Sequence, residues 1–91
     1  MRKEFRAVVR GRVQMVMYRD FAQRHAKKHH IVGTVKNLPD KTVEVVAQGE
    51  DKDLEAYLKK LHRGSLLARV DEVDITWREP SATCKGFKIV Y

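Results

Sequence analysis

Cysteine, proline and glycine are scarce in this chain of 91 residues, which has 1 Cys, 2 Pro and 5 Gly. The single cysteine, Cys84, excludes an intrachain disulfide and a zinc site built from several cysteines, and it is typical of an intracellular protein. No apolar run approaches the roughly 18 residues of a membrane span, and the N-terminal residues do not form the apolar stretch of a signal peptide. We therefore expect a cytoplasmic protein without a membrane segment.

The length and composition predict a single domain that covers residues 1–91. Hydrophobic residues make up 43% of the chain and charged residues 34%, which is typical of a globular protein and not of a disordered one. A chain of this size buries about 60–65% of the surface that its unfolded form exposes. That allows one core layer between a small sheet and two helices.

Negative charge is also in short supply, because 19 Lys and Arg face 12 Asp and Glu and the net charge is +7. Residues 1–45 hold 11 basic and 4 acidic residues, whereas residues 46–91 hold 8 of each. Such an excess favours an anionic partner, which could be a nucleic acid, an acidic membrane surface or a small phosphorylated ligand. We expect the anion site in the first half of the chain.

Hydrophobic periodicity predicts five strands and two helices. Alternating residues indicate strands, and apolar residues at i, i+3, i+4 and i+7 indicate amphipathic helices. The expected strands cover residues 5–13, 31–38, 42–48, 70–77 and 86–91, and the expected helices cover about 20–29 and 51–63, the second with Asp51 as its N-cap and Gly64 as its stop. This order implies an antiparallel sheet with both helices on one face and Arg6, Arg10, Arg12 and Lys36 on the other.

The connection between the first strand and the first helix is a candidate anion site. The start of a helix presents backbone N–H groups that lack partners, and the helix dipole attracts phosphate there. Arg19 lies at this helix entrance, where its planar guanidinium could bind a phosphate with two hydrogen bonds. The alternative from the residues alone is an ordinary arginine on an ordinary surface loop.

Two further patterns have simpler interpretations. His25 and His29 are spaced i, i+4 and could bind a metal, but no acidic residue or cysteine is placed to complete the site, so a solvated or half-buried helix face is the better interpretation. Residues 85–91 are similar to the basic and aromatic strand of an RNA-recognition motif, with Phe87 as the stacking residue. That signature belongs on the third strand, however, and here it occupies the last, so we do not expect a nucleic-acid partner.

Several linked motifs together resemble the acylphosphatase family, almost from end to end of the chain. The spacing needs no gap between residues 11 and 50. The resemblance implies a ferredoxin-like open-faced sandwich of the α+β class, with the order βαββαβ and a short extra C-terminal strand. It rests on residues 11–14 (GRVQ), 18–19 (YR), 33–40 (Gly33, Val35 and NLPD at 37–40), 43–50 (VEVVAQGE) and 86–91 (GFKIVY).

The family resemblance also implies an activity, which is hydrolysis of acyl phosphates such as acetyl phosphate to a carboxylate and inorganic phosphate. Arg19 matches the family's phosphate-binding arginine, and Asn37 matches the asparagine that orients the attacking water. In the family's mechanism the substrate phosphate itself takes the proton of that water, and no cofactor or metal is needed. The family's phosphate-binding loop falls on Gln14, Met15, Val16, Met17, Tyr18 and Arg19.

The chain departs from the family at positions that are commonly glycine. Met15 and Met17 replace loop glycines, and His30 and Lys41 replace glycines after the first helix and in the hairpin. Glycine adopts positive φ without strain, whereas a methionine there costs on the order of 1 kcal/mol. The losses at 15 and 17 leave open a catalytically weakened phosphate-binding module as the alternative function. We otherwise expect a stand-alone, monomeric acylphosphatase.

Overall fold

Five strands and two helices follow one another in the predicted order. The computed structural model describes residues 2–80, 82 and 84–91. Neither helix in this part of the chain has the length and apolar character needed to cross a membrane. The elements are β1 (Arg2–Arg12), α1 (Tyr18–Lys28), β2 (Val32–Asn37), β3 (Val43–Glu50), α2 (Asp51–Arg63), β4 (Arg69–Arg78) and β5 (Phe87–Val90).

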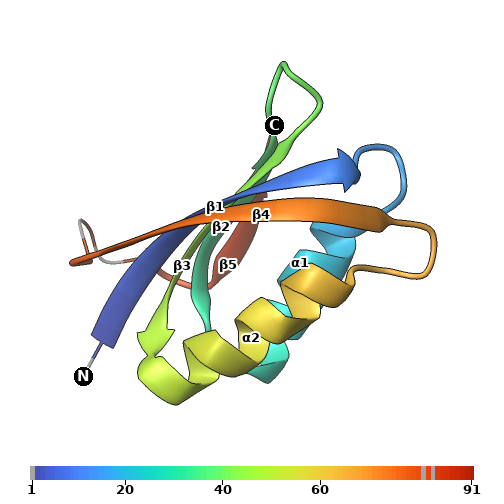
Figure 1. Ribbon diagram of the computed structural model, residues 1–91. Helices are drawn as coiled ribbons and strands as arrows, with labels where there is room; N and C mark the ends of the chain where they lie inside the picture. Colours follow the sequence, from blue (N-terminus) through green and yellow to red (C-terminus); the bar gives the residue numbers. More distant parts are fainter. Residues whose placement is uncertain (1, 81, 83) are drawn as a thin grey trace.

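The strands form one sheet in the order β4-β1-β3-β2-β5. The first four strands pair antiparallel, as predicted, and β5 adds a parallel edge beside β2, which makes the sheet mixed. Both helices cover the same face of this sheet (Figure 1). The observed arrangement confirms the ferredoxin-like α+β fold.

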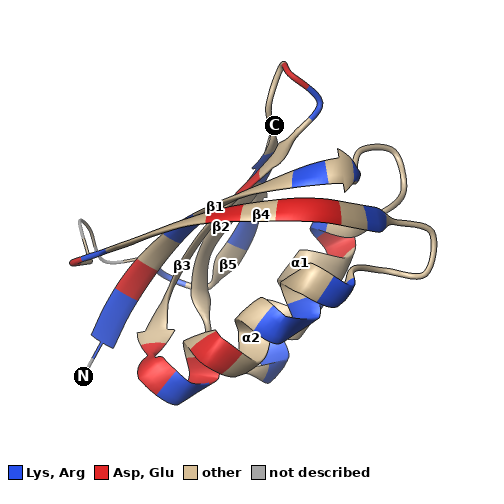
Figure 2. Cartoon of the chain, viewed as in Figure 1, with Lys and Arg blue, Asp and Glu red and all other residues tan. Residues whose placement is uncertain are grey.

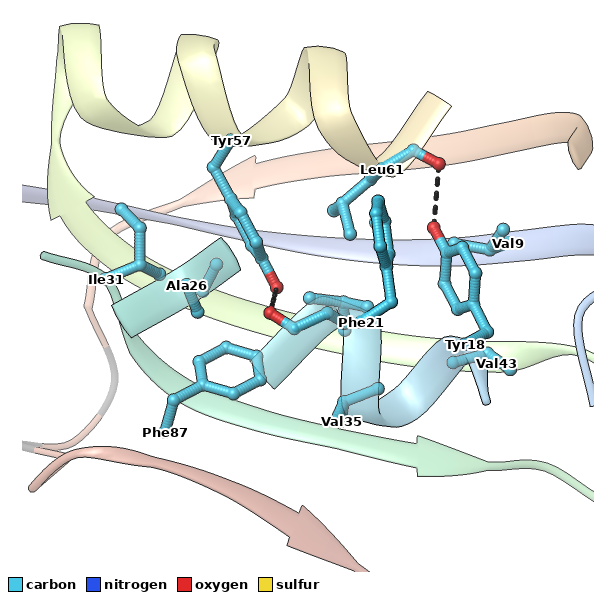
Figure 3. Close-up of a cluster of buried hydrophobic side chains, with 14 of the residues drawn as sticks. Val9, Tyr18, Phe21, Ala26, Ile31, Val35, Val43, Tyr57, Leu61 and Phe87 are labelled. Carbon is cyan, nitrogen blue, oxygen red and sulfur yellow. Dashed lines mark hydrogen bonds between the residues drawn. The ribbon is translucent and has the colours of Figure 1, made fainter. Parts of the chain in front are cut away.

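The core lies between the sheet and the two helices. Alternate residues of the central strands point into it, because successive strand side chains face opposite sides of a sheet. Figure 3 shows Tyr57 of α2 and Phe87 of β5 in this layer, with their ring centroids 6.0 Å apart. Phe87 is only 2% exposed. It therefore lies on the helix-covered face and cannot stack on an RNA base, which removes the main support for an RNA-binding function.

The helix starts differ slightly from the sequence prediction. Helix α1 begins at Tyr18, two residues before the expected Asp20, and its N-cap Met17 makes no capping hydrogen bond through its side chain. Helix α2 has Glu50 as its N-cap, so the prediction of Asp51 was wrong by one residue. Gly64 follows the last residue of α2 and ends it, as predicted.

Basic and acidic residues both lie along the strands of the sheet (Figure 2), and some of them pair across neighbouring strands. Arg6 bonds Glu44 of β3 at 2.7 Å, and Arg10 lies 3.2 Å from Asp74 of β4. The sequence predicted mainly solvated arginines here. Arg6 and Arg10 are indeed partly exposed, but carboxylates from neighbouring strands offset the charge of these two arginines.

Candidate active site

The loop of residues 13–17 between β1 and α1, here called the β1–α1 loop, is anchored by side chains. The Gln14 amide Nε2 donates to the carbonyl oxygens of Leu38 and Thr42, both at 2.9 Å, and so ties the loop to the β2–β3 hairpin. On the opposite side, the Ser65 hydroxyl donates to the carbonyl of Val16 at 3.3 Å. The α2–β4 loop therefore lies beside the β1–α1 loop, at one end of the molecule (Figure 1).

Tyr18 fixes the junction of this loop with α1. Its hydroxyl donates to the carbonyl of Leu61, near the end of α2, at 2.7 Å (Figure 3). The side chain is 1% exposed, and burial raises the pKa of Tyr18 well above its usual value because the phenolate would be poorly solvated. The hydroxyl therefore keeps its proton and acts as a permanent anchor of the helix start.

Two methionines of the loop have left-handed backbone conformations. Met15 has φ 62° and Met17 has φ 61°, and an L-residue in this region is strained by roughly 1–2 kcal/mol. Both side chains lie in solvent, with Met15 100% and Met17 70% exposed. The structure thus confirms that these positions require the backbone conformation for which the family has glycine.

The other two glycine replacements, His30 and Lys41, are left-handed as well, with φ 60° and 74°. His30 follows the C-cap of α1, where its N–H bonds the carbonyl of Lys27 and the N–H of Ile31 bonds that of Ala26. This pair of bonds defines a Schellman motif, whose left-handed residue is usually glycine. Lys41 ends the hairpin turn, with its N–H bonded to the carbonyl of Leu38 at 3.2 Å.

The backbone N–H groups of residues 15–19 have no hydrogen-bond acceptor among residues 2–80, 82 and 84–91. They belong to the β1–α1 loop and the first turn of α1, where the helix dipole adds partial positive charge. Consecutive N–H groups in such a loop form a concave anion-binding site. A tetrahedral oxyanion, such as a phosphoryl group, matches this arrangement in charge and in its need for several donors.

A shallow cleft of about 530 Å³ opens beside this loop. The Arg19 guanidinium lies over the ring of Tyr91, 5.0 Å from its centroid, and this cation–π contact restrains the arginine. Arg19 has no carboxylate partner in the described part of the chain. Its charge is therefore available to a ligand. The cleft is lined by Val13, Met15, Met17, Tyr18, Arg19, Asp20, Ile89 and Tyr91.

Asn37 ends β2 at the same end of the sheet as Tyr91. Strands β2 and β5 are parallel with Lys36 opposite Val90, so the next residues along the chain are Asn37, the last of β2, and Tyr91, which follows β5. The side-chain oxygen Oδ1 of Asn37 is buried and has no hydrogen-bond partner among the described residues. A buried acceptor without a partner is costly, and it can receive a hydrogen bond from a bound water.

The predicted site residues therefore divide into three groups. Met15, Met17, Tyr18 and Arg19 line the cleft, whereas the side chains of Gln14 and Val16 do not, because they hold the loop to the hairpin and to the core. Asn37 is not among the residues that line the cleft; it ends β2, next to the hairpin that Gln14 binds. The sequence reasoning missed Ile89 and Tyr91, whose only signal is the pairing of β5 with β2.

The described structure contains no cluster of metal-binding side chains. Among residues 2–80, 82 and 84–91, no three His, Cys, Asp or Glu side chains form a group that could hold a metal ion. His25 and His29 lie on α1, where burial, followed by the charges of Lys28 and Lys60, lowers the pKa of His25. This histidine therefore favours its neutral form.

The fold defines a small α+β protein, in which a loop whose backbone donors are free in the described part of the chain is a candidate anion site. Comparison with known proteins gives the family. The acylphosphatase family model matches residues 5–89. The acylphosphatase of Thermus thermophilus is 48% identical over 83 residues, covering 91% of this chain and 93% of that protein. The acylphosphatase of Thermococcus kodakarensis is 44% identical over 90 residues, covering 97% and 98%.

Solved structures agree with the sequence comparisons. The crystal structure of acylphosphatase from Bacillus subtilis superposes with a TM-score of 0.95 at 34% identity and covers 100% of both chains. The present chain belongs to the acylphosphatase family.

Proposed function

We propose that this protein is an acylphosphatase, which hydrolyses the carboxyl–phosphate bond of an acyl phosphate to a carboxylate and inorganic phosphate. The observation that carries the proposal is the row of N–H groups at residues 15–19 beside Arg19, none of which has a hydrogen-bond acceptor or carboxylate partner in the described part of the chain. Family membership supports the same reaction. The substrate is a small molecule with one phosphoryl group, for which this loop supplies several donors.

Arg19 and the loop amides hold the three non-bridging phosphoryl oxygens in this proposal. Phosphoryl transfer depends mainly on positioning and on stabilising the charge of the transition state. Donors fixed before the substrate arrives need no reorganisation during the reaction. The side chains of Gln14 and Tyr18 act indirectly, because they hold the loop and the helix start in place.

Asn37 orients the attacking water. Its buried Oδ1 accepts a hydrogen bond from that water, and an amide can also donate through its nitrogen. Holding the water in line with the phosphorus and the leaving oxygen lowers the entropic cost of the attack. The position of Asn37 at the end of β2, beside the cleft residue Tyr91, supports this role.

The nature of the leaving group means that the proposed reaction needs no general acid. A carboxylate is expelled, and the pKa of its conjugate acid is about 4, so it needs no proton at neutral pH. The positive charge that phosphoryl transfer requires comes from Arg19 and the backbone in this proposal. No metal or organic cofactor takes part in it.

We also propose that the protein acts as a monomer in the cytoplasm. Its single cysteine, Cys84, is unpaired, which is typical of a reducing compartment. Light scattering of the purified protein should give the mass of one chain, 10.6 kDa. A mass of two chains would contradict the monomer without affecting the activity.

The test is the hydrolysis of acetyl phosphate by the wild type and by three variants. Arg19→Ala should lower kcat/KM about 1,000-fold, as expected for losing a major donor to the transition state, and Asn37→Ala about 100-fold. The control is Arg63→Ala, because Arg63 is exposed at the end of α2 and does not line the cleft, and it should keep the wild-type rate.

Phosphate release that does not depend on Arg19 would overturn the proposal. A protein that binds phosphate through Arg19 but turns over no acyl phosphate would instead be the weakened phosphate-binding module. In that case Met15→Gly/Met17→Gly should restore turnover.

A further inference from the structure

Met15 and Met17 combine backbone strain with exposed apolar side chains. Both are left-handed, and glycine would remove the strain. Their side chains are 100% and 70% exposed, so neither gains enough from burial to offset it. Backbone strain that is not offset by side-chain burial is typical of functional sites, and here it indicates that the two side chains contact a ligand.

Both residues line the cleft that holds Arg19, and their exposed side chains are free to move over it. The remaining wall is also largely apolar, with Val13 from the end of β1 and Ile89 and Tyr91 from the C-terminal segment. Arg19 and Asp20 are the charged members of the lining. The cleft therefore offers one cationic end for a phosphoryl group and an apolar wall for what is attached to it.

The position of the phosphoryl group decides what the methionines contact. In the proposed function it is bound by the N–H groups of residues 15–19, so the acyl group must leave the loop across the cleft. We propose that Met15 and Met17 form an adjustable apolar wall for the acyl group, and that this enzyme prefers acyl phosphates with extended apolar acyl chains over acetyl phosphate. This inference rests on the proposed function.

Methionine suits such a wall because its unbranched side chain and soft sulfur adapt to ligands of different shape. His30 and Lys41 provide an internal comparison. They have the same left-handed backbone, but they lie outside the cleft lining and carry polar or charged side chains. Of these four left-handed residues, the two that line the cleft have apolar side chains, and the two outside it have polar or charged side chains.

The experiment measures kcat/KM for acetyl, butanoyl and hexanoyl phosphate. Complete burial of one methylene should raise kcat/KM roughly fourfold. An acyl chain that is only half covered should therefore gain about twofold per methylene, which is about 16-fold for the four methylenes between acetyl and hexanoyl phosphate. Met15→Gln/Met17→Gln keeps the length of both side chains and removes their apolar ends. We expect the gain to fall to about threefold or less, because contact with Ile89 and Tyr91 remains.

The matched control is His30→Gln/Lys41→Gln, which places the same amide at two left-handed positions outside the cleft and should keep the full gain. The single variants Met15→Gln and Met17→Gln serve if the double variant does not fold. Hydrolysis of all three substrates at equal kcat/KM, or a gain unchanged in the glutamine variants, would overturn this inference and leave the proposed function intact. No hydrolysis of any substrate would overturn both.

Discussion

The β1–α1 loop and the two turns at His30 and Lys41 use the same backbone conformation in different ways. Each turn satisfies its own backbone, through the N–H groups of His30 and Ile31 in one and of Lys41 in the other. The loop leaves the N–H groups of residues 15–19 without acceptors in the described structure.

This difference shows how a binding loop can be kept open. Backbone N–H groups that bind a ligand cannot also form hydrogen bonds within the loop. The loop is therefore held in place by side-chain hydrogen bonds instead. Gln14 bonds the hairpin, Tyr18 bonds α2, and Ser65 bonds the loop from the α2–β4 connection. A turn that only reverses the chain needs no such anchors.

The largest effect in stability should come from removing the anchor at Gln14. Gln14→Ala loses two hydrogen bonds, each worth about 1 kcal/mol, so the free energy of unfolding should fall by about 2 kcal/mol. The catalytic rate should fall as well, because the loop is no longer held to the hairpin beside Asn37. Urea unfolding and acetyl phosphate hydrolysis measure the two effects.

Gln23→Ala is the control for that variant, since Gln23 makes one bond, to the carbonyl of Phe87 at 2.9 Å. The free energy of unfolding of this variant should fall by about 1 kcal/mol, and its rate of acetyl phosphate hydrolysis should not change. Equal loss of rate in both variants would show that the anchoring of the loop has no special role.

A smaller effect should follow from placing glycine in the turns. His30→Gly and Lys41→Gly each relieve roughly 1–2 kcal/mol of strain, from which the greater freedom of glycine in the unfolded chain subtracts about 0.4–1 kcal/mol. Each should therefore stabilise the protein by about 0.5–1 kcal/mol without changing its activity. Thermal unfolding gives the shift, expected at about 4–8 °C per kcal/mol.

The contrast with the loop sharpens this prediction. Met15→Gly and Met17→Gly should stabilise the protein by similar amounts and also change its kinetics. If the turn variants altered the kinetics as strongly as the loop variants, the division between the two regions would be wrong.

The smallest expected effect is on the stability of the protein at acidic pH. Hydrogen bonds from the hydroxyl and N–H of Thr42 lower the pKa of Asp40 below its ordinary 3.8, because they favour the carboxylate. The folded pKa lies below the unfolded one, so this stabilisation is present above about pH 4 and is lost as the pH falls through the folded value. In urea titrations from pH 6 to pH 2.5, Asp40→Asn should lose less stability over the acid range than the wild type. Parallel curves would contradict this.

Local patterns in the sequence predicted most of the fold. Strand alternation and the apolar spacing of Leu54, Leu58 and Leu61 placed the elements within two or three residues in most cases. The start of α1 was missed because Met17 offers no capping side chain. The partners of Arg6 and Arg10 were missed because strand pairing joins residues far apart in the chain.

The candidate site was predictable only in part. The left-handed positions followed from comparing Met15, Met17, His30 and Lys41 with family glycines. Tyr91 could not be predicted as a site residue, because its contact with Arg19 depends on the parallel pairing of β5 with β2. No local pattern in residues 86–91 encodes that neighbour.

The central claim is that the free amides of the β1–α1 loop bind phosphate beside Arg19. The most direct measurement is a titration of the ¹⁵N-labelled protein with inorganic phosphate, followed by NMR. The account predicts that the backbone amides of residues 15–19 and the side-chain amide of Asn37 shift together, and that Arg19→Ala weakens all of these shifts. Shifts that leave residues 15–19 unchanged, or that gather on α2 or β4, would contradict it.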